Sequence, residues 1–190
     1  MKGYSPAKGN PYNVKKAQEL LAEAGFPGGE GFPKRTILYN TSEGHKKIAE
    51  FVQQQWERNL GIEVEIENVE WGAFLDRGAN QDFDIFRIGW QGDYLDANTF
   101  VELFLADSGM NYGKYNNPKF DELIDYAATL KGGTERYNTL HKAEEILITE
   151  DQAFIPFYFY VANHMLDTEI WGGWYNTTTN KHPPKFIYKK

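Results

Sequence analysis

The chain has 190 residues, a formal net charge of -7 and no cysteine. This length fits one ordinary domain, or a domain with a small appendage, and is enough to bury a core. The acidic balance argues against a nucleic-acid partner, because contacts to phosphate need clustered Lys and Arg. The absence of cysteine excludes disulfides, thiolate metal sites and thiol nucleophiles. No window approaches the roughly 18 apolar residues of a membrane span, and the first six residues lack the apolar core of a signal peptide, so we expect no export signal in this chain.

Helix and strand signals alternate over the first 90 residues. Helices are predicted from the cap Asn13 to Gly25 and from Thr41 or Ser42 to Gly61, with a short helix over 70–77. Strands are predicted over 36–40, 62–66 and 84–90. This order predicts an α/β fold with a mixed, mostly parallel sheet flanked by helices. Such sheets bind ligands beyond the carboxyl ends of their strands, which are residues 39–40, 67–68 and 89–93.

The second half of the chain is predicted to be mainly helical. Helices are expected over 98–106, 118–130 and 134–149. The run 154–160 is dominated by aromatic residues and predicts a buried strand, in which Pro156 indicates an edge or a bulge. Residues 172–184 are rich in Gly, Asn, Thr and Pro and predict a loop, and 186–188 is a further candidate strand.

The segment 84–100 holds the main candidate binding site. Its strand pattern contains Trp90 and is expected to end at Gly92, next to Asp93. The accessible backbone of the glycines, a flat indole and a fixed carboxylate can together hold a short peptide by its main chain and its free amino end. The same spacing also fits an ordinary strand that exits into a loop, with Trp90 in the core and Asp93 in a turn.

Other groups of residues give weaker evidence for catalysis, metal binding or phosphate binding. Asp93 and Asp96 could act as an acid and base pair, but Asp96 precedes a predicted helix and is better explained as its cap. The four histidines lack the spacing of metal ligands, and no nucleophile elbow or phosphate-binding loop is present. We therefore expect no metal or other cofactor.

Two indoles and one guanidinium have structural as well as functional explanations. Trp71 and Trp90 could line one crevice, and core packing explains either of them equally well. Arg87 lies inside an apolar strand, where an unpaired guanidinium is costly. It therefore needs a carboxylate partner from the protein or from a ligand.

Six motifs stand out along the chain, at residues 38–47, Trp56, 60–62, 68–71, 83–94 and 155–160. Together they resemble the C-terminal lobe of bacterial oligopeptide-binding proteins, the extracellular solute-binding receptors of peptide ABC transporters in the dipeptide/oligopeptide-binding family. Their order and spacing match that family over nearly the whole chain. The resemblance implies one lobe of a type II periplasmic-binding-protein-like fold, in which an extended peptide lies between two lobes that close about a hinge.

The resemblance also implies roles for individual residues. Asp93 corresponds to the carboxylate that pairs with the α-amino group of the peptide. Gly89 and Gln91 would supply main-chain pairing. Trp90 and Trp71 would form walls of side-chain pockets, which in such receptors are roomy and filled with water.

Further residues match the family, and two depart from it. Arg87 and His45 resemble the positive groups that accept peptide carboxylates of different lengths, and Tyr160 resembles a tyrosine near the hinge and the cleft. Ala97 stands where the family usually has proline. Gly78 stands where at least one relative carries arginine, so we expect the selectivity of the pocket to differ.

Chains of this family are much longer than this one. By the resemblance, 1–171 is the C-terminal ligand-binding lobe, present as a fragment, and 172–190 is a tail that returns to the other lobe. The implied partners are oligopeptides, the N-terminal lobe of the same protein and the permease subunits of the ABC transporter. The whole protein is expected in the periplasm, or outside the cell and anchored to the membrane. No enzymatic activity is expected.

Three alternatives stay open. A receptor for dipeptides, a metal chelate or a signalling peptide would belong to the same family. A carbohydrate-binding or glycoside-hydrolase domain could stack sugars on Trp71 and Trp90 and use Asp93 and Asp96 for cleavage. A structural adaptor could present aromatic surface to a partner.

Overall fold

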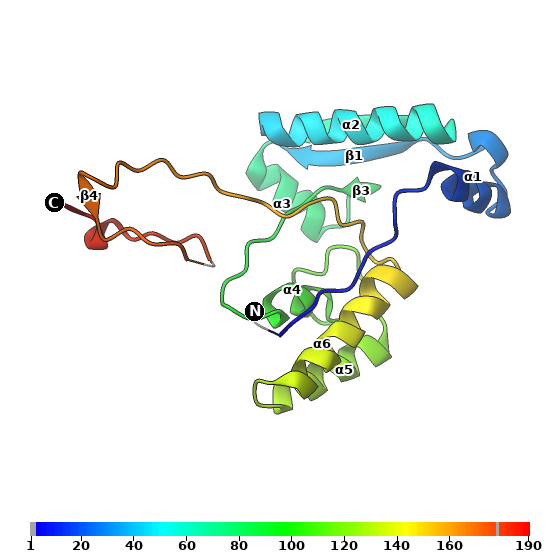
Figure 1. Cartoon of the computed structure of the whole chain (residues 1–190). Coiled ribbons are helices and arrows are strands. Elements are labelled where there is room, and N and C mark those ends of the chain that lie inside the picture. Colours follow the sequence, from blue (N-terminus) through cyan, green and yellow to red (C-terminus); the bar gives the residue numbers. More distant parts are fainter. Residues whose placement is uncertain (1–2, 178) are drawn as a thin grey trace. The chain divides into compact units, whose positions relative to one another are not determined.

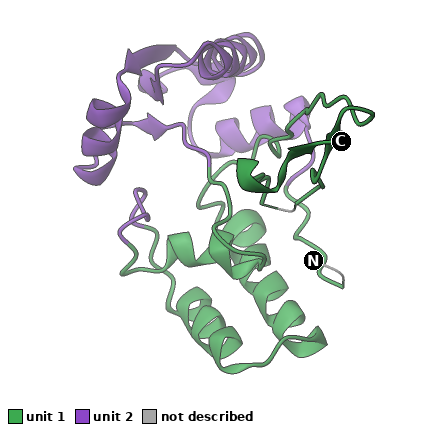
Figure 2. Cartoon of the chain, turned by 90° about the vertical axis from the view of Figure 1, so that its left-hand side faces the viewer, with its two compact units in different colours: residues 1–9, 90–108, 115–190 green, residues 10–89, 109–114 purple. Residues whose placement is uncertain are grey.

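The structure, a computed structural model, describes residues 3–177 and 179–190. The chain forms two compact units, which Figure 2 colours separately. Unit 1 comprises Met1–Gly9, Trp90–Ser108 and Tyr115–Lys190, and unit 2 comprises Asn10–Gly89 and Gly109–Lys114. One boundary between the units therefore falls between Gly89 and Trp90, inside the segment predicted to bind a ligand. The division into a lobe over 1–171 and a tail over 172–190 stays a prediction.

Unit 2 is built on the predicted parallel sheet (Figure 1). Its strands are β1 (Arg35–Asn40), β2 (Val64–Val69) and β3 (Ile85–Phe86), in the order β2-β1-β3. Ile37 of the central strand pairs with Ile66 on one side and with Ile85 on the other. A strand covered on both faces is apolar along its length, and Ile37, Leu38 and Tyr39 are all buried. The predicted α/β class is confirmed.

The helices of unit 2 begin and end close to the predicted caps. They are α1 (Val14–Glu23), α2 (Glu43–Leu60) and α3 (Trp71–Ala79), with a 3-10 turn η1 (Pro27–Gly29). Asn13 accepts a hydrogen bond from the Lys16 amide, and Ser42 accepts one from the His45 amide. Gly61 ends α2 in the left-handed region, with φ of 70°. Sheet and helices share one core, which contains Ile37, Tyr39, Ala49, Val52, Ile62 and Val64.

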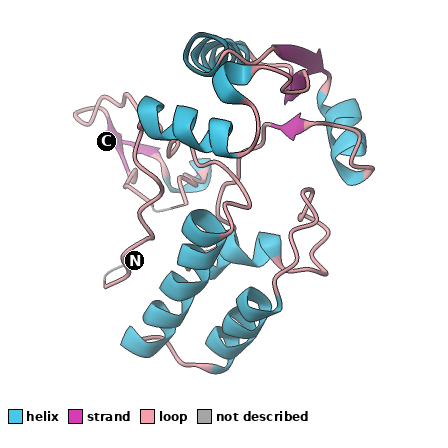
Figure 3. Cartoon of the chain, turned by 90° about the vertical axis from the view of Figure 1, so that its right-hand side faces the viewer, coloured by secondary structure: helices cyan, strands magenta, loops and turns pink. Residues whose placement is uncertain are grey.

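Unit 1 contains two helices that pack side by side, α5 (Pro118–Thr129) and α6 (Thr134–Glu145) (Figure 3). Asn117 caps α5 by accepting a hydrogen bond from the Lys119 amide. Helix α6 continues into a π-helical turn, η3 (Ile146–Glu150). Phe120 and Leu140 are fully buried in the core that these elements share with α4 (Asn98–Val101).

Three predicted elements differ from the structure. The strand over 84–90 is reduced to β3, although the Arg87 amide still donates to the Leu38 carbonyl at 2.9 Å. The helix over 98–106 is shorter and consists of α4 and the 3-10 turn η2 (Glu102–Phe104). The buried strand over 154–160 is wrong, because these residues form no strand and the side chains over 155–160 are exposed. A strand requires a hydrogen-bonded neighbour, and the described residues pair with none of this run as a strand.

A small antiparallel ladder closes the chain. Strand β4 (Trp171–Gly172) pairs with β5 (Tyr188–Lys189), and the 3-10 turn η4 (Pro184–Phe186) precedes β5. The strand predicted over 186–188 thus lies slightly later in the sequence. Gly172 suits this ladder because a Cβ atom there would lie 2.6 Å from the Tyr188 ring. Within the described part of the chain, no helix is both long and apolar enough to span a bilayer.

Candidate functional site

Polar side chains gather at the carboxyl end of the sheet in unit 2, the edge at which α/β folds bind ligands. Asn40 ends β1, and Asn68 lies in β2 in register with Tyr39. The Thr41 hydroxyl lies 3.1 Å from both Asn68 Oδ1 and the Val69 carbonyl. The Thr41 amide also donates to the Val69 carbonyl at 2.9 Å. These bonds fix the loop that follows β1 against the end of β2.

His45 and Arg87 belong to this edge of the sheet. Arg87 follows β3 directly and is only 8% exposed. His45 lies in the first turn of α2, with Nδ1 2.8 Å from Asn40 Oδ1. Because an amide oxygen can only accept a hydrogen bond, Nδ1 of His45 carries the hydrogen in this contact.

Arg87 affects the protonation of His45. Burial lowers the pKa of His45, the positive charge of Arg87 lowers it further, and a hydrogen bond with the backbone of Asn40 opposes both effects. An anionic group bound beside Arg87 would offset that positive charge. A carboxylate that bound beside Arg87 would therefore couple its binding to protonation of His45.

Trp71 provides an exposed aromatic face in unit 2. It is the first residue of α3 and is 50% exposed. Its ring stacks on Phe74 with a centroid distance of 5.6 Å, and Phe74 stacks on Phe86 at 4.2 Å. Gly78 leaves room for this column, because a Cβ there would lie 2.7 Å from Phe86 Cζ. One face of the Trp71 indole is thus packed on Phe74, and the exposed part of the ring can present a flat apolar surface to a ligand.

The loop at 90–93 in unit 1 carries the predicted anchoring carboxylate. Asp93 is exposed, while its backbone amide donates to Thr99 Oγ1 at 3.1 Å. Thr99 is only 1% exposed and therefore holds the loop firmly to α4. Gly92 permits this close approach, because a Cβ there would lie 3.0 Å from Thr99 Cγ2 and 3.2 Å from Phe100 Cζ.

Asp96 has a structural role. Its Oδ1 accepts a hydrogen bond from the Asn98 amide at the start of α4, as a cap does. Its Oδ2 lies 2.6 Å from Nη1 of Arg136. A carboxylate engaged in both contacts is poorly placed to be the second member of an acid and base pair with Asp93.

The remaining predicted site residues lie in unit 1, apart from Gly89, which ends its part of unit 2. The Gln91 side chain donates to the Thr179 carbonyl at 2.9 Å. The Trp90 Nε1–H is buried and has no hydrogen-bond partner among the described residues. Tyr160 is exposed, and its ring contacts Tyr158 at a centroid distance of 4.9 Å.

The structure thus brings Arg87 and His45 together within unit 2 and places Trp90, Gln91 and Asp93 on one loop of unit 1. Sequence reasoning did not identify the residues that hold these groups in position, which are Asn40, Thr99, Phe74 and Arg136. The spacing of Trp71 and Phe74, one helical turn apart, was a signal for the aromatic column.

Comparison with known proteins identifies the family. The model of "Bacterial extracellular solute-binding proteins, family 5 Middle" matches residues 1–112. The chain belongs to this family. The periplasmic oligopeptide-binding protein OppA of Salmonella typhimurium is 39% identical over 176 residues, which cover 93% of this chain and 31% of that protein.

Solved structures of family 5 relatives agree with the fold. An oligopeptide-binding protein of Borrelia burgdorferi, OppAIV, matches with a TM-score of 0.88 and 32% identity, over 100% of this chain and 38% of that one. The OppA of Haemophilus influenzae in complex with the peptide RPPGFSPFR matches with a TM-score of 0.66 and 38% identity, over 70% of this chain and 26% of that one. These relatives are solute-binding proteins of the type II periplasmic fold, as predicted. The chain spans about a third of their length.

Proposed function

We propose that this chain supplies peptide-binding groups to the substrate-binding component of an ABC peptide importer, and that it is not an enzyme. Membership of family 5 supports the proposal, as does the relative from Haemophilus influenzae, which is in complex with a peptide. The groups on the chain match the two ends of a peptide. An ammonium group suits Asp93, and a carboxylate suits Arg87 and His45.

The exposed carboxylate of Asp93 on a fixed backbone carries the proposal. Thr99 holds the amide of Asp93, so the loop need not be ordered again when a ligand binds. An exposed ion pair contributes only about 0–1 kcal/mol. Once water is excluded, loss of one partner of a paired charge costs about 3–5 kcal/mol. Asp93 therefore becomes a strong anchor for the α-amino group only in a closed, dry environment.

The other predicted residues would contribute contacts that do not select a sequence. We propose that the backbone groups of Gly89 and Gln91 form hydrogen bonds with the main chain of the peptide, as the edge strand of a sheet does with an added strand. Trp71 and Trp90 would form walls of side-chain pockets, and Tyr160 would lie near the hinge and the cleft of the whole protein. Main-chain pairing and flat walls accept many side chains, which suits a receptor for peptides of varied sequence.

The whole protein would supply what this chain does not. We propose that 1–171 acts with a second, N-terminal lobe, that 172–190 returns to that lobe, and that permease subunits of the importer receive the closed receptor. The protein would work in the periplasm, or outside the cell on a membrane anchor. Because closure needs the second lobe, the chain alone is expected to bind peptides weakly or not at all.

A chimera tests this proposal. The chain replaces the matching third of Salmonella typhimurium OppA, and calorimetry measures the binding of a pool of tripeptides to pentapeptides. We expect binding that falls roughly a hundredfold or more when the peptides are acetylated at the amino end, or when Asp93→Asn is introduced. Asp107→Asn, at another exposed acidic residue of unit 1, is the matched control and should leave binding unchanged.

Two outcomes would contradict the proposal. One is a folded chimera that binds acetylated and free peptides equally well, since a sugar-binding or adaptor surface would ignore the amino end. The other is binding by the isolated chain that is as tight as binding by the chimera, since the closure argument would then fail.

A further inference from the structure

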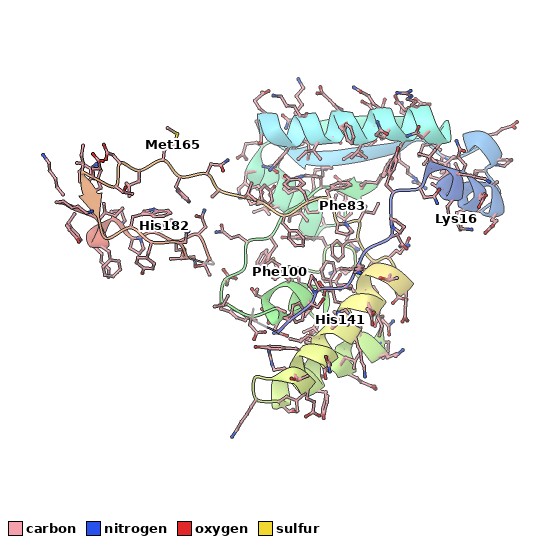
Figure 4. All side chains as sticks on the ribbon, viewed as in Figure 1. Lys16, Phe83, Phe100, His141, Met165 and His182 are labelled. Atoms are coloured by element: carbon pink, nitrogen blue, oxygen red, sulfur yellow. The ribbon has the colours of Figure 1, made fainter. Side chains whose placement is uncertain are left out.

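Two histidine side chains of the C-terminal segment converge on one oxygen atom. His164 Nε2 lies 2.7 Å from Asn180 Oδ1, and His182 Nε2 lies 3.1 Å from the same atom. The two imidazole nitrogens are therefore within two hydrogen-bond lengths of each other. Figure 4 labels His182 on this segment, with Met165 on the neighbouring stretch of chain.

The imidazole rings are held by aromatic contacts. His182 stacks on Trp174, with a centroid distance of 4.8 Å and an interplanar angle of 19°. His164 meets His182 edge-on at 4.7 Å and contacts Trp174 at 5.4 Å. Since ring packing restricts rotation of both side chains, the two Nε2 atoms are aimed before any ligand arrives.

A local turn fixes the third side chain. The Thr177 hydroxyl accepts a hydrogen bond from the Lys181 amide at 2.9 Å and lies 3.1 Å from the Lys181 carbonyl. The Asn180 amide donates to the Thr177 carbonyl at 3.1 Å. Asn180 adopts a φ of 53°, a left-handed conformation that Asn tolerates better than most residues. Its side chain is thereby directed at the two histidines.

We propose that His164, His182 and Asn180 form a binding site for one divalent transition-metal ion of the Ni²⁺, Cu²⁺ or Zn²⁺ class. Neutral imidazoles are preferred ligands of these ions, whereas Ca²⁺ and Mg²⁺ prefer sets of oxygen ligands. The ion would lie about 2.0–2.1 Å from each Nε2. Each ring would carry its hydrogen on Nδ1 instead of Nε2, so that both Nε2 lone pairs face the metal.

The remaining coordination positions would belong to the Asn180 oxygen and to water. His164 is exposed and His182 is half-buried, so solvent can reach the site. Among the described residues, no group of three or more His, Asp or Glu is placed to hold a metal. The affinity would therefore depend on the two imidazoles, and removal of either one should be sufficient to weaken binding strongly.

Calorimetry on the full chain, with Ni²⁺ or Zn²⁺ alone, tests the site. We expect one ion per chain, no comparable binding of Ca²⁺, and affinity that weakens by roughly tenfold or more in His164→Gln and in His182→Gln. The Gln side chain can still donate to Asn180, so the variants keep the hydrogen bond and lose the ligand. His141→Gln, which changes a histidine of α6 bonded to the Ser5 carbonyl, is the matched control and should bind as the parent chain does.

A second measurement does not depend on the variants. Paramagnetic Ni²⁺ should broaden the NMR signal of the Trp174 indole, which contacts both histidines, whereas diamagnetic Zn²⁺ should leave that signal sharp. Binding should also weaken in acid, because protons compete for ligand nitrogens. Absence of Ni²⁺ and Zn²⁺ binding, binding by either Gln variant that is as tight as that of the parent chain, or a Trp174 indole signal that Ni²⁺ leaves sharp would overturn the proposal.

Discussion

Asp96 Oδ2 lies 2.6 Å from Nη1 of Arg136, so the segment that follows the Asp93 loop is tied to helix α6. Both side chains are largely buried, with 24% and 13% of their side-chain surface exposed. Arg136 Nε also donates to the Ala127 carbonyl at 3.1 Å. Asp96 in turn caps α4 through the Asn98 amide. The ion pair and these two hydrogen bonds therefore connect α4, α5 and α6 through the segment that follows Asp93.

Arg136→Ala is expected to lower the free energy of unfolding by about 1–3 kcal/mol, because it leaves the largely buried carboxylate of Asp96 without its charged partner. Arg136→Lys should have a smaller effect, since Lys keeps the charge. Its single ammonium group cannot reproduce the two contacts of the guanidinium, with Asp96 Oδ2 and with the Ala127 carbonyl. Urea unfolding measures both values. Lys119→Ala, at an exposed position of α5, is the control, and an equal effect in that variant would contradict the structural role of Arg136.

The pKa of His45 is expected to depend on Arg87. Arg87→Gln removes a positive charge that lowers this pKa, so the pKa should rise. Titration of the His45 ring protons by NMR measures the change. Lys46→Gln removes a positive charge that pairs with Glu50 instead, and it should leave the titration of His45 unchanged. A fall in the pKa after Arg87→Gln would contradict the electrostatic coupling.

The lowered pKa of His45 also predicts how stability changes with pH. At pH values between the folded and the unfolded pKa of His45, the unfolded chain binds more protons at His45 than the folded chain does. Stability therefore increases with pH across this interval. The contribution is complete above the unfolded pKa of 6.5 and is lost as the pH falls through the lower, folded value. His45→Asn should remove this part of the pH dependence in urea unfolding measured between mildly acidic and neutral pH.

The sequence predicted the elements whose signals are local. Asn13, Ser42 and Gly61 mark helix ends because the caps use neighbouring backbone groups, and the central strand is evident from its run of apolar residues. The strand over 84–90 was overestimated because its pairing with β1 ends just after Arg87. The strand over 154–160 was predicted from composition alone, whereas strand formation depends on a distant neighbour that composition cannot specify.

The binding role of the candidate site stays a prediction, and the sequence carried signals for only some of the residues that form it. The combination of an indole and a carboxylate at Trp90 and Asp93 led to the prediction of a binding site, and Arg87 was included because an unpaired guanidinium in an apolar strand is costly. Their supports could not be predicted, since Thr99 and Arg136 act through contacts that only folding creates. A threonine in a short helix has no sequence signature of that role.

Gly78→Ala is expected to destabilise unit 2 by about 1–3 kcal/mol, because the new Cβ would lie 2.7 Å from Phe86 Cζ in a packed core. Gly44→Ala is the matched control in helix α2, where the nearest heavy atom outside the helix backbone, Ser42 Oγ, is 3.8 Å from the new Cβ. That change should stabilise the chain by about 0.4–1 kcal/mol, as Gly to Ala does at unstrained helical positions. Thermal unfolding should therefore shift in opposite directions, and shifts of the same sign would argue against close packing at Gly78.

The exposed aromatic run at 155–161 is expected to make the chain bind apolar dyes and associate with itself. Phe159 is 90% exposed and Val161 is 83% exposed, and a contiguous apolar surface of this kind marks a site of interaction. The double change Phe159→Ser and Val161→Ser should reduce dye fluorescence and association with little effect on stability, because these side chains bury almost nothing. Met165→Ser, at a fully exposed single position, should change neither property. Dye fluorescence measures dye binding, and sedimentation velocity on the same samples measures self-association. Equal values for the double variant and the parent chain would show that residues 155–161 are not the surface responsible for either property.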